Sequence, residues 1–337
     1  MNSLERVMTA VTGSDADHQP FTMTLSLLGA RLINADIVDY YRNPAVWYKG
    51  QEQAITLFDP DIILTPFSFP LEAEAWGCEL SFLPQYAPNI KKPIITDPEE
   101  ISQFHIPAFS HPSLQFFLQT TSLLAEKYKG NKAIAAPLHS PCDLPCLLMG
   151  TELWIDTLLF KPNEAARIIE KTTEHFVALG NQFLERGATF LVVPVNFTNP
   201  LMITNKIFRQ LQPYLQKAFQ QIKGPIVVHN GGCILKPFLH HFAALPNVIA
   251  IVLDPREKFS EAREILGNEI TLMGNFDGPN LGNLTQEQVK EKCMKILDDR
   301  KHDNHFIFAS SNADIPYNTP LENIKILADT IRNFKKY

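Results

Sequence analysis

The chain has 337 residues, a formal net charge of -6, 45% hydrophobic residues and 20% charged residues. This composition is typical of a globular protein that can bury a sizeable core. The chain has no long basic run, which argues against a nucleic-acid-binding protein. No apolar stretch reaches the roughly 20 residues of a membrane span, and the first residues lack the pattern of a secretion signal. Because the five scattered cysteines do not suggest a disulfide framework, we expect a cytoplasmic protein.

Eight short apolar or β-branched runs predict β-strands, with helix-like segments in the intervals. In chain order they span residues 21–27, 61–67, 133–138, 189–195, 225–229, 248–254, 270–276 and 305–310. Alternating strands and helices imply a parallel sheet. An open doubly wound sheet would give a similar pattern, but eight such units favour closure into an α/β structure of the (β/α)8 TIM barrel type.

The interval between the second and third strands, residues 67–132, is rich in proline and too long for a simple crossover. We expect it to form an excursion over the barrel mouth. No linker or change in composition marks a second domain, so residues 1–337 are predicted to form a single barrel domain. The sequence does not fix the oligomeric state, and a homodimer stays open.

In a TIM barrel, ligands bind at the carboxyl ends of the strands. Nearly every predicted strand here ends in polar side chains. They are Ser26, Ser68, His139 with Ser140, Asn196, His229 with Asn230, Asp254, Asn275 with Asp277, and Ser310 with Ser311. Any one of them could be an ordinary turn or capping residue. Their coincidence around one rim predicts a ligand pocket.

Some of these side chains have two interpretations. His139 could face His229 across the rim, where an imidazole can act as a base, or it could be satisfied by a backbone carbonyl. Glu72 and Glu74 could act as a general acid or base. We expect them instead to be solvated at the start of a helix, where the helix dipole favours negative charge.

Five segments, spread over nearly the whole chain, form a recognisable set. They are PFSFPLEAEAWGCE, APLHSPCDLPCLLMGTE, PIVVHNGG, LMGNFDGP and NADIPYNTPLENIKIL. Together they resemble the uroporphyrinogen decarboxylase superfamily, which includes methylcobamide:thiol methyltransferases. EAEAWGCE and ADIPYNTPLENI look most like the methyltransferase branch. The resemblance implies a (β/α)8 barrel, a small-molecule, tetrapyrrole or corrinoid ligand, and a corrinoid protein as a partner.

In the decarboxylase branch, arginines after the first strand bind substrate carboxylates, and an aspartate follows the second strand. The matching segments here are FTMTLSLLGARLI, in which only Arg31 is present, and PFSF, with Ser68 at the aspartate position. A porphyrinogen has many carboxylates, and a pocket for it needs several fixed cations. The resemblance therefore leaves tetrapyrrole decarboxylation as the alternative activity.

In the methyltransferase branch, a His-x-Cys motif and a cysteine of the last loop bind zinc, which lowers the pKa of the acceptor thiol. His229 aligns with the histidine, but the two cysteine positions fall on Gly231 and Ala313. Cys233 could supply a thiolate, because the glycines before it allow the loop to fold back. The resemblance thus implies a divergent zinc site with His229 and Cys233 as ligands. A third ligand stays open among Asp314, Cys142 and Glu72.

Our first hypothesis is an enzyme that transfers a methyl group between a corrinoid or methylated small molecule and an acceptor. The alternatives are a tetrapyrrole decarboxylase and a barrel that binds a ligand without catalysis. The candidate catalytic residues are His229, His139 and Asp277, and the candidate substrate-binding residues are Arg31, Ser68, Asn196, Asn230 and Asn275.

Overall fold

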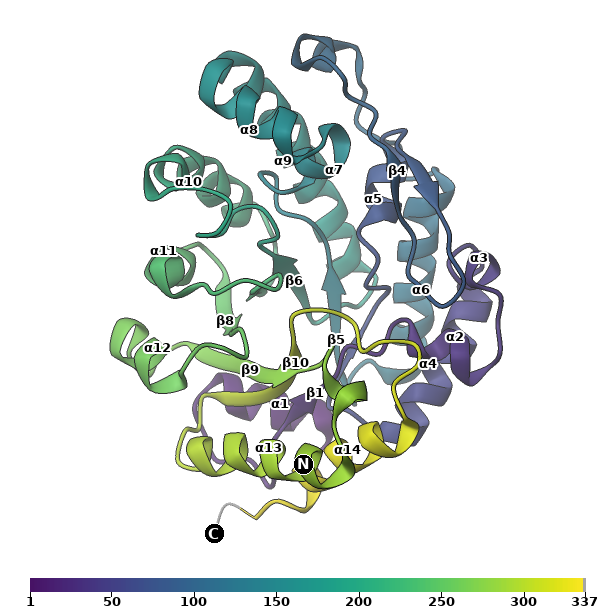
Figure 1. Cartoon of the computed structure of the whole chain (residues 1–337), viewed down its shortest axis with the longest axis vertical. Helices are drawn as coiled ribbons and strands as arrows, with labels where there is room; N and C mark the ends of the chain where they lie inside the picture. The colour runs from purple at the N-terminus through teal and green to yellow at the C-terminus, as the bar shows by residue number, and fades with distance from the viewer. Residues whose placement is uncertain (336–337) are drawn as a thin grey trace.

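A closed barrel of eight parallel strands forms the centre of the computed structural model, which describes residues 1–335 (Figure 1). The barrel strands are β1 (Phe21–Thr22), β2 (Ile62–Leu64), β5 (Ala133–Pro137), β6 (Phe190–Pro194), β7 (Ile226–His229), β8 (Val248–Val252), β9 (Thr271–Asp277) and β10 (Phe306–Ser311). Their order around the barrel is β1-β10-β9-β8-β7-β6-β5-β2, and β1 pairs with β2 to close it. The predicted TIM barrel is confirmed, and each predicted strand range overlaps an observed strand.

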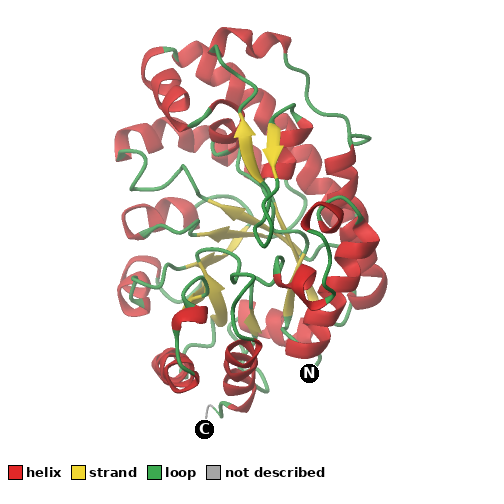
Figure 2. Cartoon of the chain, turned by 45° about the vertical axis from the view of Figure 1, so that its right-hand side comes forward, coloured by secondary structure: helices red, strands yellow, loops and turns green. Residues whose placement is uncertain are grey.

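Helices surround the strands on the outside of the barrel (Figure 2). The α-helices are α1 (Ser3–Val11), α2 (Leu28–Leu32), α3 (Ile37–Tyr40), α4 (Pro44–Phe58), α5 (Pro70–Ala75), α6 (Pro112–Tyr128), α7 (Leu144–Met149), α8 (Thr151–Phe160), α9 (Pro162–Glu185), α10 (Asn205–Gln220), α11 (Leu239–Ala243), α12 (Phe259–Leu266), α13 (Gln286–Arg300) and α14 (Leu321–Asn333). Short 3-10 helices are η1 (Pro98–Gln103), η2 (Lys236–Phe238) and η3 (Leu281–Asn283). None of the helices in residues 1–335 combines the length and the apolar character that crossing a membrane requires.

The first strand is much shorter than the predicted 21–27, because the chain leaves the sheet after Thr22. The Thr24 backbone N–H donates to the Ser310 hydroxyl at 2.9 Å, and the Thr24 carbonyl accepts from the Ile315 N–H. These partners come from the end of β10 and the loop after it, not from a neighbouring strand. An apolar run in the sequence does not show this change of partner.

The excursion after β2 contains α5, a small antiparallel sheet of β3 (Glu79–Ser81) and β4 (Asn89–Lys92), η1 and α6. The two strands stand apart from the barrel strands in Figure 2. Gln85, in the turn between β3 and β4, accepts a hydrogen bond from Asn318 in the loop after β10. The predicted excursion therefore exists, and its tip contacts a loop at the carboxyl end of the barrel.

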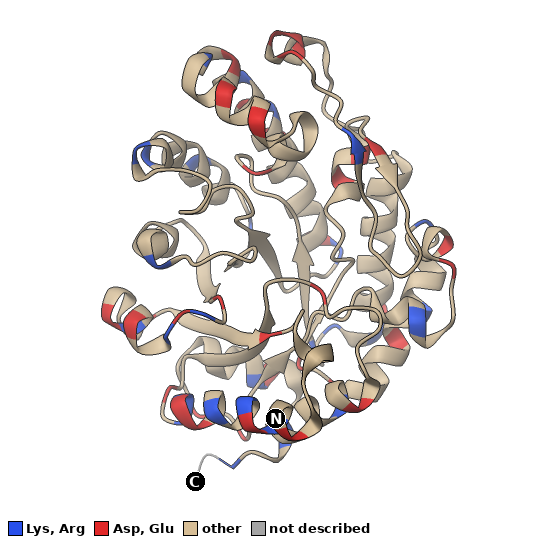
Figure 3. Cartoon of the chain, in the orientation of Figure 1, with Lys and Arg blue, Asp and Glu red and all other residues tan. Residues whose placement is uncertain are grey.

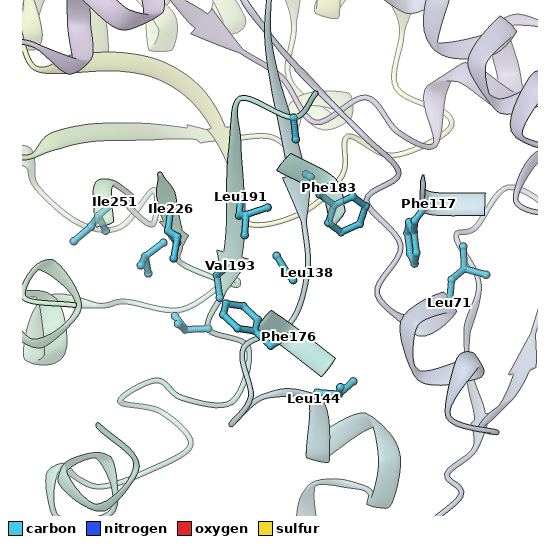
Figure 4. Close-up of a cluster of buried hydrophobic side chains, with 14 of the residues drawn as sticks. Leu71, Phe117, Leu138, Leu144, Phe176, Phe183, Leu191, Val193, Ile226 and Ile251 are labelled. Atoms are coloured by element: carbon cyan, nitrogen blue, oxygen red, sulfur yellow. The ribbon is translucent and has the colours of Figure 1, made fainter. Parts of the chain in front are cut away.

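Alternating side chains of each strand face opposite sides of the barrel wall, as the twofold period of a strand requires. Leu191 and Val193 of β6 pack outward with Phe176 of α9 in the larger apolar core (Figure 4). Phe190 and Val192 belong to a second cluster, made up of alternate residues of the other strands and of Val7 and Ala10 of α1. Since these are apolar side chains of the barrel interior, α1 closes the amino end of the barrel and leaves the carboxyl end for a ligand.

One prediction concerns the contact between α2 and α4. A Cβ at Gly50 would lie 2.5 Å from the Gly29 carbonyl oxygen, so Gly50→Ala forces the two helices apart. We expect this substitution to lower the free energy of unfolding by about 2 kcal/mol, because overpacking outweighs the better helix propensity of alanine. Urea denaturation followed by circular dichroism measures the change.

Gly282→Ala is the matched control, because a Cβ there meets its nearest atom at 3.4 Å, an ordinary contact. We expect it to change stability by less than about 0.5 kcal/mol. Equal effects of the two substitutions would contradict the close packing of α2 against α4.

Candidate active site at the barrel mouth

Two imidazoles lie at the carboxyl end of the barrel strands, which we call the mouth. His229 is the last residue of β7, and His139 follows β5 by two residues. Phe69 lies with its ring centroid 4.4 Å from that of His139, and Phe67 lies 6.0 Å from His229. The two phenylalanine rings are themselves 4.9 Å apart. The segment after β2 thus supplies a half-buried aromatic wall that connects the two buried histidines.

The backbone of the next loop sets the hydrogen-bonding state of His229. Its Nδ1 accepts a hydrogen bond of 3.1 Å from the Gly231 N–H. Burial lowers the pKa of His229 to about 4, so the ring is neutral at neutral pH. A neutral imidazole has one N–H, and an accepting Nδ1 places that hydrogen on Nε2. His229 therefore offers a hydrogen-bond donor at Nε2, not a lone pair.

His139 is held by a carboxylate, not by a backbone carbonyl. Its Nδ1 lies 3.2 Å from Oε2 of Glu72, and the same oxygen accepts the His139 backbone N–H at 3.1 Å. The other carboxylate oxygen lies 3.2 Å from Nε2 of His175 on α9. Only 2% of Glu72 is exposed. Our expectation of a solvated Glu72 was wrong, because α5 presents this residue to the protein interior.

The charge of Glu72 determines the tautomer of His139. Burial alone would raise the pKa of this carboxyl, but the hydrogen bonds with His139 and the close approach of the His175 ring outweigh it and lower the pKa to about 2. The group is therefore an ionised acceptor at neutral pH. His139 must place its hydrogen on Nδ1, and when the ring is neutral the lone pair is on Nε2. The two imidazoles at the mouth thus have opposite tautomers.

Glu74 differs from Glu72, although both are on α5. Its carboxylate forms an ion pair of 2.5 Å with Arg42 and accepts from the Ser113 hydroxyl. These contacts lower the pKa of Glu74 against the opposing effect of burial. Glu74 is half-buried and anchors α5 to the helices beside it, so we assign it no part in the site.

The residues at the mouth do not fit the zinc ion that the resemblance implies. Gly231, at one expected cysteine position, has φ +60°. A Cβ there would lie 2.5 Å from Oδ1 of Asn196 and 3.0 Å from the backbone nitrogen of Asn196. Ala313, at the other position, is exposed. His229 has its hydrogen on the ring nitrogen that a metal would need. In residues 1–335, no group of three or more His, Cys, Asp or Glu side chains could hold a metal ion.

The substitute ligands that the sequence left open are also unsuited to zinc. The Cys233 thiol faces the Gly231 carbonyl, with 4.0 Å between Sγ and that oxygen, and the Cys142 thiol is fully buried. Glu72 is occupied by the two histidines. The side-chain oxygens of Asp314 accept the backbone N–H groups at positions 26 and 27, at 2.9 and 2.7 Å, and burial raises the pKa of this group to about 8. These contacts hold the last loop against the start of α2.

Three other predicted residues lie at the mouth. Asn230 is fully buried and donates to Oδ1 of Asn312 at 2.7 Å, whereas its own Oδ1 has no hydrogen-bond partner within residues 1–335. Ser68, between the two phenylalanines in sequence, is buried, and its hydroxyl likewise has no partner in that range. Asn196 is exposed beside the glycine loop. Unpaired buried polar atoms are costly, so Asn230 and Ser68 are suitable for binding a ligand.

Arg31 is oriented toward the protein, not toward the mouth. Its Nη1 donates to the carbonyls of Tyr317 and Thr319, at 3.0 and 2.6 Å. Both acceptors belong to the loop after β10. The guanidinium therefore fixes this loop on α2, and a role in substrate binding stays a prediction.

Asn275 and Asp277, at the end of β9, lie apart from the histidines. Asn275 donates to the carbonyls of Asp254 and Glu257, and so ties β9 to the loop after β8. Both residues line a groove of about 760 Å³ between α12 and α13, and the lining of this groove includes neither imidazole. Their assigned roles stay predictions.

The sequence patterns do not indicate a role at the site for His175, Phe67 or Phe69, and they suggest the wrong environment for Glu72. His175 lies inside a long amphipathic helix, where a lone histidine gives no signal. The alternation of Phe and Ser in PFSFP was the available signal for the aromatic wall, because apolar side chains there continue beyond the end of β2.

Another prediction uses the depressed pKa of His229. The folded protein has a pKa of about 4 at this ring, whereas an unfolded chain has about 6.5. Between these values the unfolded state binds more protons, so the free energy of unfolding falls as the pH falls through this window. The full loss amounts to about 3 kcal/mol. Urea denaturation at several pH values from about 4 to 7.5 measures it.

His229→Asn is the comparison, because its side-chain oxygen can still accept the Gly231 N–H but cannot titrate. We expect the stability of this variant to depend less steeply on pH across the same window. Identical slopes for the two proteins would contradict a buried neutral His229.

Comparisons with known proteins agree with the barrel. A family model described as uroporphyrinogen decarboxylase (URO-D) matches residues 2–334. Uroporphyrinogen decarboxylase of Neisseria meningitidis is 23% identical over 311 residues, which cover 89% of this chain and 86% of that protein. Methylcobamide:CoM methyltransferase MtaA of Methanosarcina barkeri is 21% identical over 332 residues, which cover 96% and 95%.

Among solved structures, a methyltransferase from Methanosarcina mazei superposes with a TM-score of 0.88 at 19% identity, covering 99% of both chains. At this identity the superposition supports the fold alone, and the family match extends over almost the entire length. The chain therefore belongs to the uroporphyrinogen decarboxylase (URO-D) family.

Proposed function

We propose that this chain is a methyltransferase that moves a methyl group from a corrinoid or a methylated small molecule to a small acceptor. Relatives of both the decarboxylase and the methyltransferase kind cover most of its length, so similarity alone does not choose between them. The choice rests on the charge of the mouth.

The observation that supports methyl transfer is the shortage of cations at the mouth. Among the described segments that lead from a barrel strand to the next helix, the one arginine is Arg256, between β8 and α12, whereas Arg31 lies within α2, the helix that follows β1. Arg31 binds backbone carbonyls, and Arg256 forms a bidentate pair with Asp254 at 2.6 and 2.7 Å. In Figure 3, charged residues gather on the outer helices, and the centre is largely uncharged. A polycarboxylate substrate needs several free guanidiniums.

The polar groups that remain are suited to a smaller, less charged ligand. We assign Ser68, Asn196 and Asn230 to ligand binding, together with the aromatic wall of Phe67 and Phe69. An apolar wall with a few directed polar groups is typical of small-molecule sites. A corrinoid protein that delivers the methyl group to the mouth is part of this proposal.

A direct assay tests the choice of reaction. The protein is incubated with methylcobalamin and a panel of small thiols, and mass spectrometry follows the methylated thiol. A parallel reaction with uroporphyrinogen follows the loss of carboxylates. We expect methyl transfer at least tenfold above the rate without protein, and no decarboxylation. His302→Gln, on the exposed loop before β10, should behave like the unmodified protein.

Decarboxylation without methyl transfer would reverse the proposal. Binding of methylcobalamin or a thiol without turnover, seen by calorimetry, would instead favour the non-catalytic barrel.

A further inference from the structure

Glu72 is paired with two histidines. The metal site that the family resemblance implies gives no reason for this pairing. A carboxylate buried in apolar surroundings is costly unless it is paired. Here His139 comes from the loop after β5 and His175 from α9, so three separate segments meet at one charge. Of the three, His139 stands at the mouth.

The arrangement of His139 is that of a general base. A carboxylate on one ring nitrogen orients an imidazole, fixes its tautomer and stabilises the positive charge that forms when the other nitrogen takes up a proton. The Nε2 atom of His139 has no hydrogen-bond partner in the part of the chain that the structure describes. When the ring is neutral, no described residue therefore uses the lone pair of Nε2, which lies beside the Phe69 ring of the aromatic wall.

The other ionisable groups around His139 do not compete for this role. Glu72 and His175 face it from α5 and α9. On its own loop, Asp143 accepts the backbone N–H groups of Phe197 and Thr198, at 2.6 and 3.1 Å, and the hydroxyl of Ser140. Its carboxylate is thus occupied in fixing the next loop.

We propose that the protein activates its acceptor without zinc, with His139 as the base, Glu72 as its positioning residue and His229 as a hydrogen-bond donor. This inference rests on the proposed methyl transfer. The acceptor thiol gives its proton to Nε2 of His139. A sulfur electron pair forms the new S–C bond to the methyl group. At the same time the bond between that carbon and the leaving group of the donor breaks, and its electron pair stays on the leaving group. The proton then passes to water.

His139→Asn tests the base, because the asparagine N–H can replace Nδ1–H toward Glu72 while the lone pair of Nε2 is lost. At neutral pH we expect methyl transfer to a thiol to fall about a hundredfold. At about pH 9.5, where the thiol ionises unaided, the loss should shrink to a few fold. Glu72→Gln should give a smaller loss with the same recovery, and His302→Asn should show neither effect.

Three measurements on the unmodified protein do not depend on how the variants fold. Nitrogen NMR should show the hydrogen of His139 on Nδ1. Elemental analysis should find far less than one zinc ion per chain, and a chelator should not change the rate of methyl transfer.

The outcomes separate this inference from the proposed function. An equal loss at both pH values, or a rate abolished by the chelator, would overturn the inference while methyl transfer stands. A hydrogen on Nε2 of His139 would overturn it whatever the reaction. Absence of methyl transfer with every acceptor would remove the proposed function, and the NMR result would still decide whether His139 is arranged as a base.

Discussion

The buried charge of Glu72 is the constraint on which the arrangement of the mouth depends. An ionised carboxylate inside a protein must be paired, and removing one partner of a buried pair typically costs about 3–5 kcal/mol. Here the partners are His139 and His175, so the carboxylate ties α5 to the loop after β5 and to α9. Phe69 directly precedes α5, and fixing this helix also fixes the ring that packs on His139. One electrostatic requirement thus positions both the imidazole and the wall beside it.

The barrel could be predicted because its strands are buried on both faces and appear as continuous apolar runs. The site could be predicted only where it depends on strand ends, as for His139 and His229. Glu72 was misjudged because the helix-dipole argument is local, whereas its burial depends on residues 67 and 103 positions later in the chain. The same holds for the first strand, which ends early because Thr24 bonds to Ser310. Partners at such separations leave no periodic trace in a sequence.

The loss of the expected zinc ligands involves more than two substitutions. At Gly231, the positive φ and the close approach of Asn196 mean that any side chain would need the loop to move. The same loop conformation brings the Gly231 N–H to Nδ1 of His229 and so places the ring hydrogen on Nε2. One backbone conformation therefore has two consequences. Residue 231 has no room for a side chain, and Nε2 of His229 carries a hydrogen in place of the lone pair that a metal ion would bind.

The tautomers of the two imidazoles follow from different parts of the fold, and this makes them complementary. A backbone donor fixes His229 as an N–H donor, and a carboxylate acceptor fixes His139 with its lone pair on the outer nitrogen. Two histidines of the same tautomer would offer either two hydrogen-bond donors or two acceptors. Such a pair could not bind a ligand that has one donor group and one acceptor group. Because neither tautomer depends on a metal or on a free cation, the site is suited to a neutral acceptor that must lose a proton. A polycarboxylate would instead find Arg31 and Arg256 already bound to other partners.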